Sequence, residues 1–579
     1  MKKTLMVLAA GMLALTSFSA AINLNGSWDF RFHEKKAIEE VDIGNGNFTD
    51  TMVVPGCFDM MPKWYLKRGT AVYSRSFVLD EDKKEGYLVI DGMGLRGKFM
   101  LDGKDLGLYA LPYSRLEIPT GELKAGRHTL TAALDNRFDW KTTKLALSYY
   151  DFYFYGGFYH GVSLKFDNRK LFVRTSDLQR GEVEIEAVNF PEKDFEALVS
   201  FDGVSPRKLR FTNSRVKATL QNASLWSPET PNLHTVKVAV DGLAPCSARF
   251  GLRTIVAKDK HIYLNGEKLF LKGVNRHESN MQYGTSTTED LMLRDLQLIK
   301  ATGANFIRGA HYPQSQRFLD LCDEVGILVW EESLGWGNDQ DYTTGKNNSE
   351  VKDPEWQKLQ IEQTRLMVRN SFNHPSVIIF GFLNECGSLK PHVKDIVDAL
   401  IRTIKAEDSG RLVTFACNMI EGDLCCENVD LVSFNTYPGI IPAQPGAADE
   451  FHKKVSERFT QITKIFRERY PDKPIMCSET GTAALYGERD PGAAVLTEEF
   501  QIEYLSYVLD TIWNNPDLSG FSIWQFCDNR VNHRNGRAVD SGKRMGYSQA
   551  GIFNAERMPK LSVKTVTDYF TNRTPASIK

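Results

Sequence analysis

Short runs in which apolar and polar residues alternate fill the first part of the chain, from position 21 to about 166. The runs at 87–90, 97–101 and 128–134 are separated by glycine, aspartate and asparagine. Alternation with a period of two indicates half-buried strands, and closely spaced turn residues indicate antiparallel sheets. The pattern therefore predicts a β-sandwich of the jelly-roll type over 21–166.

A second and shorter series of such runs lies between 167 and 250. Strands are predicted at 171–174, 183–187, 197–201 and 235–240, with a turn-rich segment from Trp226 before the last strand pair. A domain of this length, built from short alternating strands, fits an immunoglobulin-like β-sandwich.

After about Gly251 the pattern changes to strands that alternate with helices, which favours a parallel sheet with helices outside it. Eight apolar runs predict strands at 269–273, 306–310, 327–331, 377–383, 412–416, 431–435, 475–478 and 520–525. Eight such units close a (β/α)8 TIM barrel. We therefore predict a multidomain chain whose last part, 251–579, is a TIM barrel.

The segments between these strands have helical periodicity. Met292, Leu296 and Ile299 fall on one stripe, and Thr288 stands where an N-cap residue is expected. A second stripe comprises Val455, Phe459, Ile462 and Phe466. The last barrel helix is predicted over 561–570.

Two glutamates each stand where one of the apolar strands ends. Glu385 follows the fourth predicted strand and Glu479 the seventh. A carboxylate is costly to bury, so an acid at this place is paired, hydrogen-bonded or faces a solvated cleft. One such acid is ordinarily structural, but two on different repeats favour catalysis, because the carboxyl ends of barrel strands surround one active-site mouth.

A pair of carboxyl groups can cleave a glycosidic bond. The reaction needs one protonated acid for the leaving oxygen and one anion for the oxocarbenium-like centre. A separation of about 5–5.5 Å gives retention of configuration, and about 6.5–9.5 Å gives inversion. We assign Glu385 as acid/base and Glu479 as nucleophile, with the pKa of Glu385 raised by burial and by the charge of Glu479.

The first 20 residues have the layout of a secretory signal peptide, with Lys2 and Lys3 before an apolar run and a small-residue exit. The apolar run is too short to span a bilayer, so we expect a periplasmic or secreted protein that is not a membrane protein. A net charge of -2 gives no electrostatic reason to expect nucleic acid as a partner.

Cysteine and histidine spacing predicts neither a cofactor nor a metal site. The nine cysteines show no paired spacing, and Cys425-Cys426 fits no ligand pattern. Cys322, Cys417, Cys477 and Cys527 lie in apolar segments, where a buried thiol is expected. The expected partner is a carbohydrate substrate, and a homo-oligomer is compatible with the sequence.

Three stretches resemble glycoside hydrolase family two, the β-galactosidase, β-glucuronidase and β-mannosidase group. They read NFIRGAHYP from Asn305, NHPSVIIFGFLNE from Asn373 and GVNRHE from Gly273. The domain order also matches, over nearly the whole mature chain. The resemblance implies the same acid/base and nucleophile. In three places the chain departs from it, with Phe380 where tryptophan is usual, Leu383 where glycine is usual, and Gly309 as an unusual residue after Arg308.

The resemblance also implies substrate-binding residues. Tyr437 is expected to hydrogen-bond the nucleophile, whereas His311, Asn384 and Trp524 are expected to line the sugar site. Asp151 resembles the acid that the first sandwich sends into the pocket of glucuronidase-like members.

The chain length resembles the β-glucuronidase branch, whose members hold the sugar carboxylate with an Asn-x-Lys loop. Here Ser548 and Ala550 occupy those two positions, while Arg544 keeps the place of a nearby arginine. Arg530 and Arg534 lie in the same insertion. Guanidinium groups suit a planar carboxylate, although each of the three arginines could equally be a solvated loop charge. The preferred substrate is therefore a β-uronide, either a glucuronide or a galacturonide.

Three alternatives stay open at this point. One is a β-galactosidase that acts on neutral galactosides. Another is a non-catalytic carbohydrate-binding protein, which would need neither Glu385 nor Glu479. The third is a transglycosylase, which would use the same residues.

Overall fold

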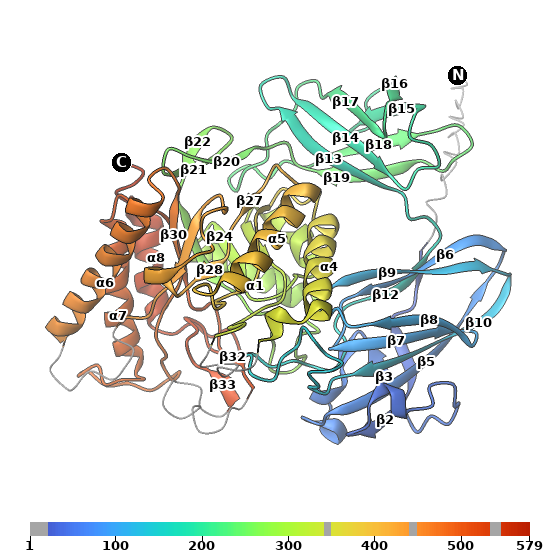
Figure 1. Cartoon of the computed structure of the whole chain (residues 1–579), viewed down its shortest axis with the longest axis horizontal. Helices are drawn as coiled ribbons and strands as arrows, with labels where there is room; N and C mark the ends of the chain where they lie inside the picture. Colours follow the sequence, from blue (N-terminus) through green and yellow to red (C-terminus); the bar gives the residue numbers. More distant parts are fainter. Residues whose placement is uncertain (1–20, 341–348, 439–447, 533–545) are drawn as a thin grey trace, which may run out of the picture.

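The computed structural model describes residues 21–340, 349–438, 448–532 and 546–579, which form two β-sandwiches and a barrel (Figure 1). This architecture confirms the predicted fold class. The predicted signal peptide, Arg534 and Arg544 lie outside the described residues. In the part of the chain that is described, no helix is both long and apolar enough to cross a bilayer.

The N-terminal sandwich consists of two antiparallel sheets. One sheet has the order β1 (Ile22–Asn23), β12 (Val162–Lys165), β6 (Lys83–Asp91) and β9 (Arg115–Leu123). The other has the order β3 (Asp50–Val54), β2 (Gly26–Glu34), β5 (Gly69–Leu79), β10 (Gly126–Asp135), β7 (Arg96–Leu101) and β8 (Lys104–Tyr109). Buried residues of both sheets, such as Leu88, Ile118 and Leu130, belong to one apolar core.

The second sandwich has seven strands in two sheets. They are β13 (Lys170–Asp177), β14 (Glu182–Val188) and β17 (Arg215–Thr219), facing β16 (Arg207–Phe211), β15 (Phe195–Phe201), β18 (His234–Ala239) and β19 (Cys246–Phe250). Alternate residues of β14 are buried, as the sequence pattern predicts. The domain has its own apolar core, which includes Ile185, Val199 and Val236.

All eight predicted barrel strands are present and parallel. They are β23 (Leu271–Asn275), β24 (Phe306–Gly309), β25 (Leu328–Glu332), β26 (Val377–Gly381), the split fifth strand β27 (Leu412–Val413) and β28 (Ala416–Cys417), β29 (Val432–Asn435), β30 (Ile475–Thr480) and β31 (Leu518–Ile523). Because β27 pairs with β26 and β28 pairs with β29, the fifth strand closes the barrel.

A small antiparallel sheet covers the amino ends of the barrel strands. It contains β20 (Ile255–Lys258), β21 (His261–Leu264) and β22 (Glu267–Leu269). Ile262 of this sheet shares an apolar cluster with Leu271 and Phe306. The sequence predicted that the first barrel strand starts at Leu269, but Leu269 is the last residue of β22. The prediction was wrong at this point because one apolar run in the sequence covers parts of both strands.

The outer helices follow the predicted stripes. They are α1 (Glu289–Ala301), α2 (Gln316–Val325), α4 (Pro354–Asn370), α5 (Pro391–Glu407), α6 (Ala448–Arg469), α7 (Glu498–Trp513) and α8 (Ser562–Asn572). Met292, Leu296 and Ile299 of α1 are buried. Thr288 occupies the N-cap position of α1, as predicted, although its hydroxyl donates to the Asp290 carboxylate and accepts no hydrogen bond from a backbone N–H.

A long connection of the N-terminal sandwich reaches the mouth of the barrel. It runs from the end of β10 to β11 (Gly157–Phe158) and lies near β32 (Asn529–Arg530) in Figure 1. Tyr153 N donates to Arg530 O over 3.1 Å, and Asn338 Nδ2 donates to the Tyr150 hydroxyl over 3.0 Å. These contacts hold Asp151 at the end of the barrel where the strands finish.

Candidate active site

Glu385 and Glu479 both lie at the carboxyl end of the barrel, on opposite sides of the fifth and sixth strands. Glu479 is the second-last residue of β30 and is almost fully buried. Glu385 comes four residues after β26 and is mostly, though not completely, buried. Leu383 and Glu385 have left-handed backbone φ angles of 44° and 51°, which turn the chain sharply as it leaves the strand. Such angles cost a non-glycine residue about 1–2 kcal/mol each.

Arg308, at the end of β24, is the central cation of the site. Its guanidinium donates to Glu479 Oε1 over 2.5 Å from Nη1 and to Glu332 Oε1 over 2.7 Å from Nε. It also donates to Asn384 Oδ1 over 2.9 Å. Arg308 is fully buried, so these charge-assisted contacts are little screened by solvent. They fix one oxygen of Glu479 in place and keep a positive charge beside it.

The two catalytic candidates are linked by amide side chains. Asn435, at the end of β29, donates from Nδ2 to Glu385 Oε1 and to Asn384 Oδ1, each over 3.0 Å. The other oxygen of Glu479 accepts from the Tyr437 hydroxyl over 2.6 Å. Glu385, Asn384, Tyr437 and Glu479 therefore belong to one hydrogen-bonded network, as the sequence predicts for Tyr437.

The two glutamates experience different electrostatic environments. Burial, and then the nearby charge of Glu479, raise the pKa of Glu385 from 4.5 to about 8, although Asn435 and Arg308 partly oppose the shift. Glu479 instead faces the Arg308 guanidinium and the Tyr437 hydroxyl. At neutral pH the raised pKa of Glu385 favours its protonated form, whereas Glu479 lies against a cation.

His311 is a neutral ring in this site. Burial, and then the charge of Arg308, lower its pKa to about 3. Its Nδ1 lies 3.1 Å from Glu332 Oε2, and its ring stacks on Trp524 with 5.4 Å between centroids. Its Nε2 is buried, has no hydrogen-bond partner among the described residues and lies 3.9 Å from Glu479 Oε1.

A second buried polar atom is left without a protein partner. Asn384 Nδ2 makes no hydrogen bond to the described residues, although the side-chain oxygen of Asn384 accepts two. Unsatisfied buried donors are rare in folded proteins and mark places where a ligand or water completes the bonding. Asn384 and His311 therefore each have a group available to a bound sugar.

Asp151 comes from the N-terminal sandwich, and the structure brings it close to this network. Its negative charge raises the pKa values of His311, Glu385 and Tyr437, although it is not the largest cause for any of them. The remaining predicted residue, Arg544, lies outside the described residues. Arg530 is described and is largely buried, with Nη2 donating to the Tyr65 hydroxyl over 2.9 Å.

Several residues of the network were not singled out by the sequence. They are Arg308, Glu332, Asn275 and Asn435. A signal existed for two of them. Arg308 is the single charge in the otherwise apolar strand β24, and Glu332 ends β25 as an acid, the same pattern that marks Glu479. Asn275 and Asn435 also lie at strand ends, but a neutral polar residue at such a position does not by itself indicate a functional role.

Protein comparisons agree with this arrangement. The model of the glycosyl hydrolases family 2 TIM barrel domain matches residues 255–573, and a second model, glycosyl hydrolases family 2, matches residues 164–253. A Streptococcus agalactiae β-glucuronidase is 24% identical, with 95% of this chain and 96% of that protein aligned. A Felis catus β-glucuronidase is 29% identical, with 60% of this chain and 53% of that protein aligned.

Among solved structures, a β-galacturonidase from Eisenbergiella tayi bound to galacturonate is 28% identical. It has a TM-score of 0.82, and the alignment covers 96% of this chain and 98% of that one. The Faecalibacterium prausnitzii β-glucuronidase, 23% identical with a TM-score of 0.83, shares the fold. The barrel-domain match alone spans more than half of the sequence. The chain therefore belongs to glycosyl hydrolase family 2 and is a glycoside hydrolase.

Proposed function

We propose that the protein is a retaining exo-β-glycosidase that removes terminal β-linked uronic acid residues by double displacement. The observation that carries this proposal is the unequal environment of its two carboxyl groups. Glu385 keeps its proton at neutral pH, while Glu479 is paired with Arg308 and Tyr437. Hydrolysis of an acetal needs one neutral acid and one anion.

In the first step Glu479 attacks the anomeric carbon and forms a C–O bond to it, while the bond to the leaving oxygen breaks. Glu385 gives its proton to that oxygen, so the departing group leaves as an alcohol. Glu479 is then an ester without charge, which removes one cause of the raised pKa of Glu385. The carboxylate of Glu385 can now accept a proton.

In the second step Glu385 takes a proton from water, and the water oxygen attacks the same carbon. The ester bond to Glu479 breaks, and both carboxyl groups return to their starting states. Two inversions at one carbon give net retention. The Asn384 Nδ2 donor and the His311 Nε2 atom, neither of which has a partner among the described residues, are proposed to bind sugar hydroxyl groups during both steps.

The preference for a uronide rests on the comparisons and on the role that the family resemblance implies for Arg544. The E. tayi structure is named for a galacturonide substrate, and several relatives are named for glucuronides. Ser548 and Ala550 stand where the resemblance places the Asn and Lys of glucuronidases. We therefore favour a galacturonide over a glucuronide and propose Arg544 as a carboxylate ligand.

A panel of 4-nitrophenyl β-glycosides tests this proposal. The galacturonide should give the highest kcat/KM, followed by the glucuronide, with the neutral galactoside and mannoside far lower. A galactoside as the best substrate would replace the uronidase assignment by the alternative β-galactosidase. Proton NMR of the first-formed sugar should show the β anomer, whereas the α anomer would refute the nucleophilic role of Glu479.

We also propose that the protein is exported from the cytoplasm. The Lys2-Lys3 start and the apolar run that follows support a signal peptide, and hence a periplasmic or secreted enzyme that meets carbohydrate outside the cytoplasm. Mass spectrometry of the mature N-terminus from cells tests this. A retained Met1 would contradict it.

A further inference from the structure

Four of the nine cysteines gather in one buried cluster behind the loop that carries Glu385. Cys386 follows the acid/base residue directly, Cys417 ends β28, and Cys425 and Cys426 lie on the connection after it. Each thiol-bearing residue is at most 1% exposed. Asp423 lies among them and is also buried. None of the nine cysteines forms a disulfide.

The donor atoms of this cluster have the spacing of a metal site. Cys417 Sγ, Cys426 Sγ and a carboxylate oxygen of Asp423 all lie within 4.8 Å of one another. Tetrahedral zinc, with Zn–S near 2.3 Å and Zn–O near 2.0 Å, requires about 3.8 Å between two sulfurs and about 3.5 Å between sulfur and oxygen. Cys417 Sγ and Asp423 Oδ1 are 3.6 Å apart.

The carboxylate is already oriented for this role. Asp423 Oδ2 accepts backbone N–H groups of Cys425, over 3.2 Å, and Cys426, over 2.8 Å. Its Oδ1 is thereby directed at the Cys417 thiol. The Ser388 hydroxyl is 3.6 Å from Cys417 Sγ and offers a further oxygen donor. Such backbone hydrogen bonds are how metal ligands are commonly held in position.

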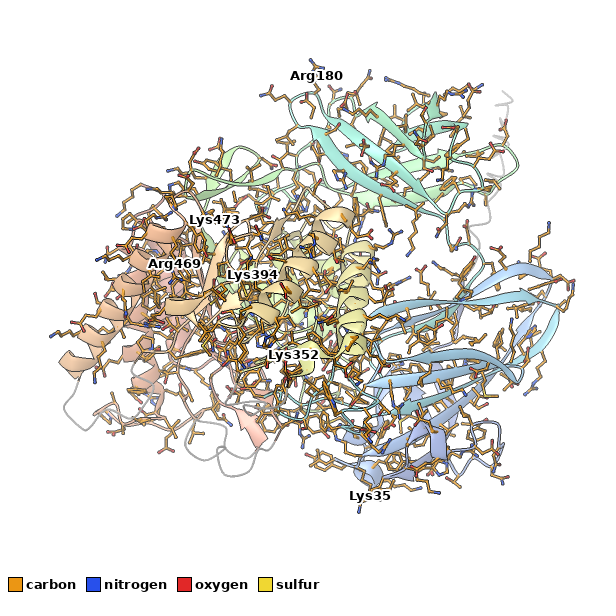
Figure 2. The ribbon with its side chains drawn as sticks, in the orientation of Figure 1. Lys35, Arg180, Lys352, Lys394, Arg469 and Lys473 are labelled. Atoms are coloured by element: carbon orange, nitrogen blue, oxygen red, sulfur yellow. The ribbon has the colours of Figure 1, made fainter. Side chains whose placement is uncertain are left out.

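Among the described residues, Asp423 forms no ion pair. Lys394 and Lys473, both labelled in Figure 2, contact other groups: Lys394 pairs with Asp398 and Glu427, and Lys473 donates to the Cys426 and Glu427 carbonyls.

Binding of a divalent ion would leave the net charge of the cluster unchanged. Zinc binding releases one proton from each of the Cys417 and Cys426 thiols. The cluster holds one net negative charge before, from Asp423, and one net negative charge after, from two thiolates, one carboxylate and Zn²⁺.

We propose that Cys417, Asp423 and Cys426 bind a structural zinc ion. The ion would fasten the end of the fifth barrel strand, at Cys417, to the connection that follows it. Gln340 links this region to Glu385, because its Nε2 donates to Asn418 Oδ1 over 2.8 Å and to the Glu385 carbonyl. The spacing Cys-x5-Asp-x2-Cys, with one oxygen ligand, explains why the cysteine and histidine spacing predicted no metal.

Elemental analysis of the full-length protein tests the proposal. The purified chain, dialysed against metal-free buffer after exposure to a zinc salt, should retain about one zinc per chain. Cys426→Ser and Asp423→Asn should each retain at least about tenfold less, whereas Cys246→Ser, a buried thiol of the second sandwich, should retain the full amount. Replacement by Co²⁺ should give sulfur-to-cobalt charge-transfer absorption in the unmodified protein.

Three results would overturn the proposal. Zinc at the level of a buffer blank in the unmodified protein would do so, as would equal zinc in Cys246→Ser and Cys426→Ser. The third is a Cys417–Cys426 disulfide, found as a loss of two mass units in the peptide that contains both residues. The measurements on the unmodified chain decide the question even if the cluster variants fail to fold.

Discussion

Replacing Glu385 by glutamine should stabilise the folded protein while removing most of its activity on unactivated glycosides. The folded-state pKa of Glu385 is about 8, against 4.5 for an ordinary glutamate, because the group is buried beside Glu479. A raised pKa means that the protonated form is favoured in the folded state. The contribution of Glu385 to stability is therefore fully present below about pH 4.5 and is lost as pH rises to about 8.

The size of the effect on stability follows from the difference between the unfolded-state and folded-state pKa values of Glu385. Each unit of pKa difference corresponds to about 1.36 kcal/mol, so the ionisable group costs roughly 3 kcal/mol at pH 7 and roughly 5 kcal/mol above pH 8. Glutamine is close in shape and its side-chain oxygen can still accept from Asn435 Nδ2. It carries no charge, so the variant avoids this cost at every pH.

The assay is thermal unfolding of both proteins at pH 5 and at pH 8, at constant ionic strength. The Tm of Glu385→Gln should exceed that of the unmodified protein by several degrees at pH 8 and by little at pH 5. Glu468→Gln, on an exposed face of α6, is the control and should shift Tm at neither pH. Equal shifts at pH 5 and pH 8, or a less stable Glu385→Gln at pH 8, would refute the assignment of a buried, proton-holding carboxyl.

Kinetics on the same variant separate acid catalysis from binding. General acid catalysis contributes about 10²–10⁴-fold, so hydrolysis of an alkyl uronide should fall by that factor. A nitrophenyl leaving group departs without a proton, and its release should fall far less. Equal losses on both substrates would show that Glu385 is not the acid.

Further predictions concern the neighbours of Glu385. Glu479→Gln should lower turnover by several orders of magnitude with an unchanged circular dichroism spectrum, and residual activity near the unmodified level would exclude it as nucleophile. Tyr437→Phe removes a hydrogen bond to a charged group, worth about 1.5–3 kcal/mol, and should lower kcat/KM about 10–100-fold in steady-state assays. In the unmodified enzyme, kcat/KM for an alkyl uronide should decline above about pH 8, as Glu385 loses its proton, and pH–rate profiles should show no such decline in Glu385→Gln. Leu383→Gly relieves a left-handed angle worth about 1–2 kcal/mol but empties a fully buried site worth about 2–5 kcal/mol, so its Tm should fall.

The sequence predicted the parts of the fold that depend on local periodicity. The eight barrel strands and the α1 stripe follow from apolar spacing, which burial on one face imposes. The error at Leu269, and the missing capping hydrogen bond at Thr288, arose where local signals compete. An apolar run can cover two short strands, and a threonine hydroxyl can bond to a neighbouring carboxylate as readily as to a backbone N–H.

The site was predictable where one residue breaks an apolar pattern and unpredictable where partners come from distant strands. Glu385 and Glu479 stand out because an acid follows a buried strand. The role of Arg308 depends on four neighbours brought together only by barrel closure, and no spacing within the chain encodes that. The thiol cluster is similar, since Cys386 and Cys417 are separated in sequence by a whole helix.

The connection from the N-terminal sandwich into the barrel mouth makes substrate recognition a joint property of two domains. Asp151 belongs to a segment that the barrel does not encode, yet it approaches Glu385 and His311. Substitutions in this connection of the N-terminal sandwich can therefore change which sugar is accepted. The barrel strands that carry the catalytic residues need not change. A barrel expressed by itself would keep both glutamates but would lack one wall of its pocket.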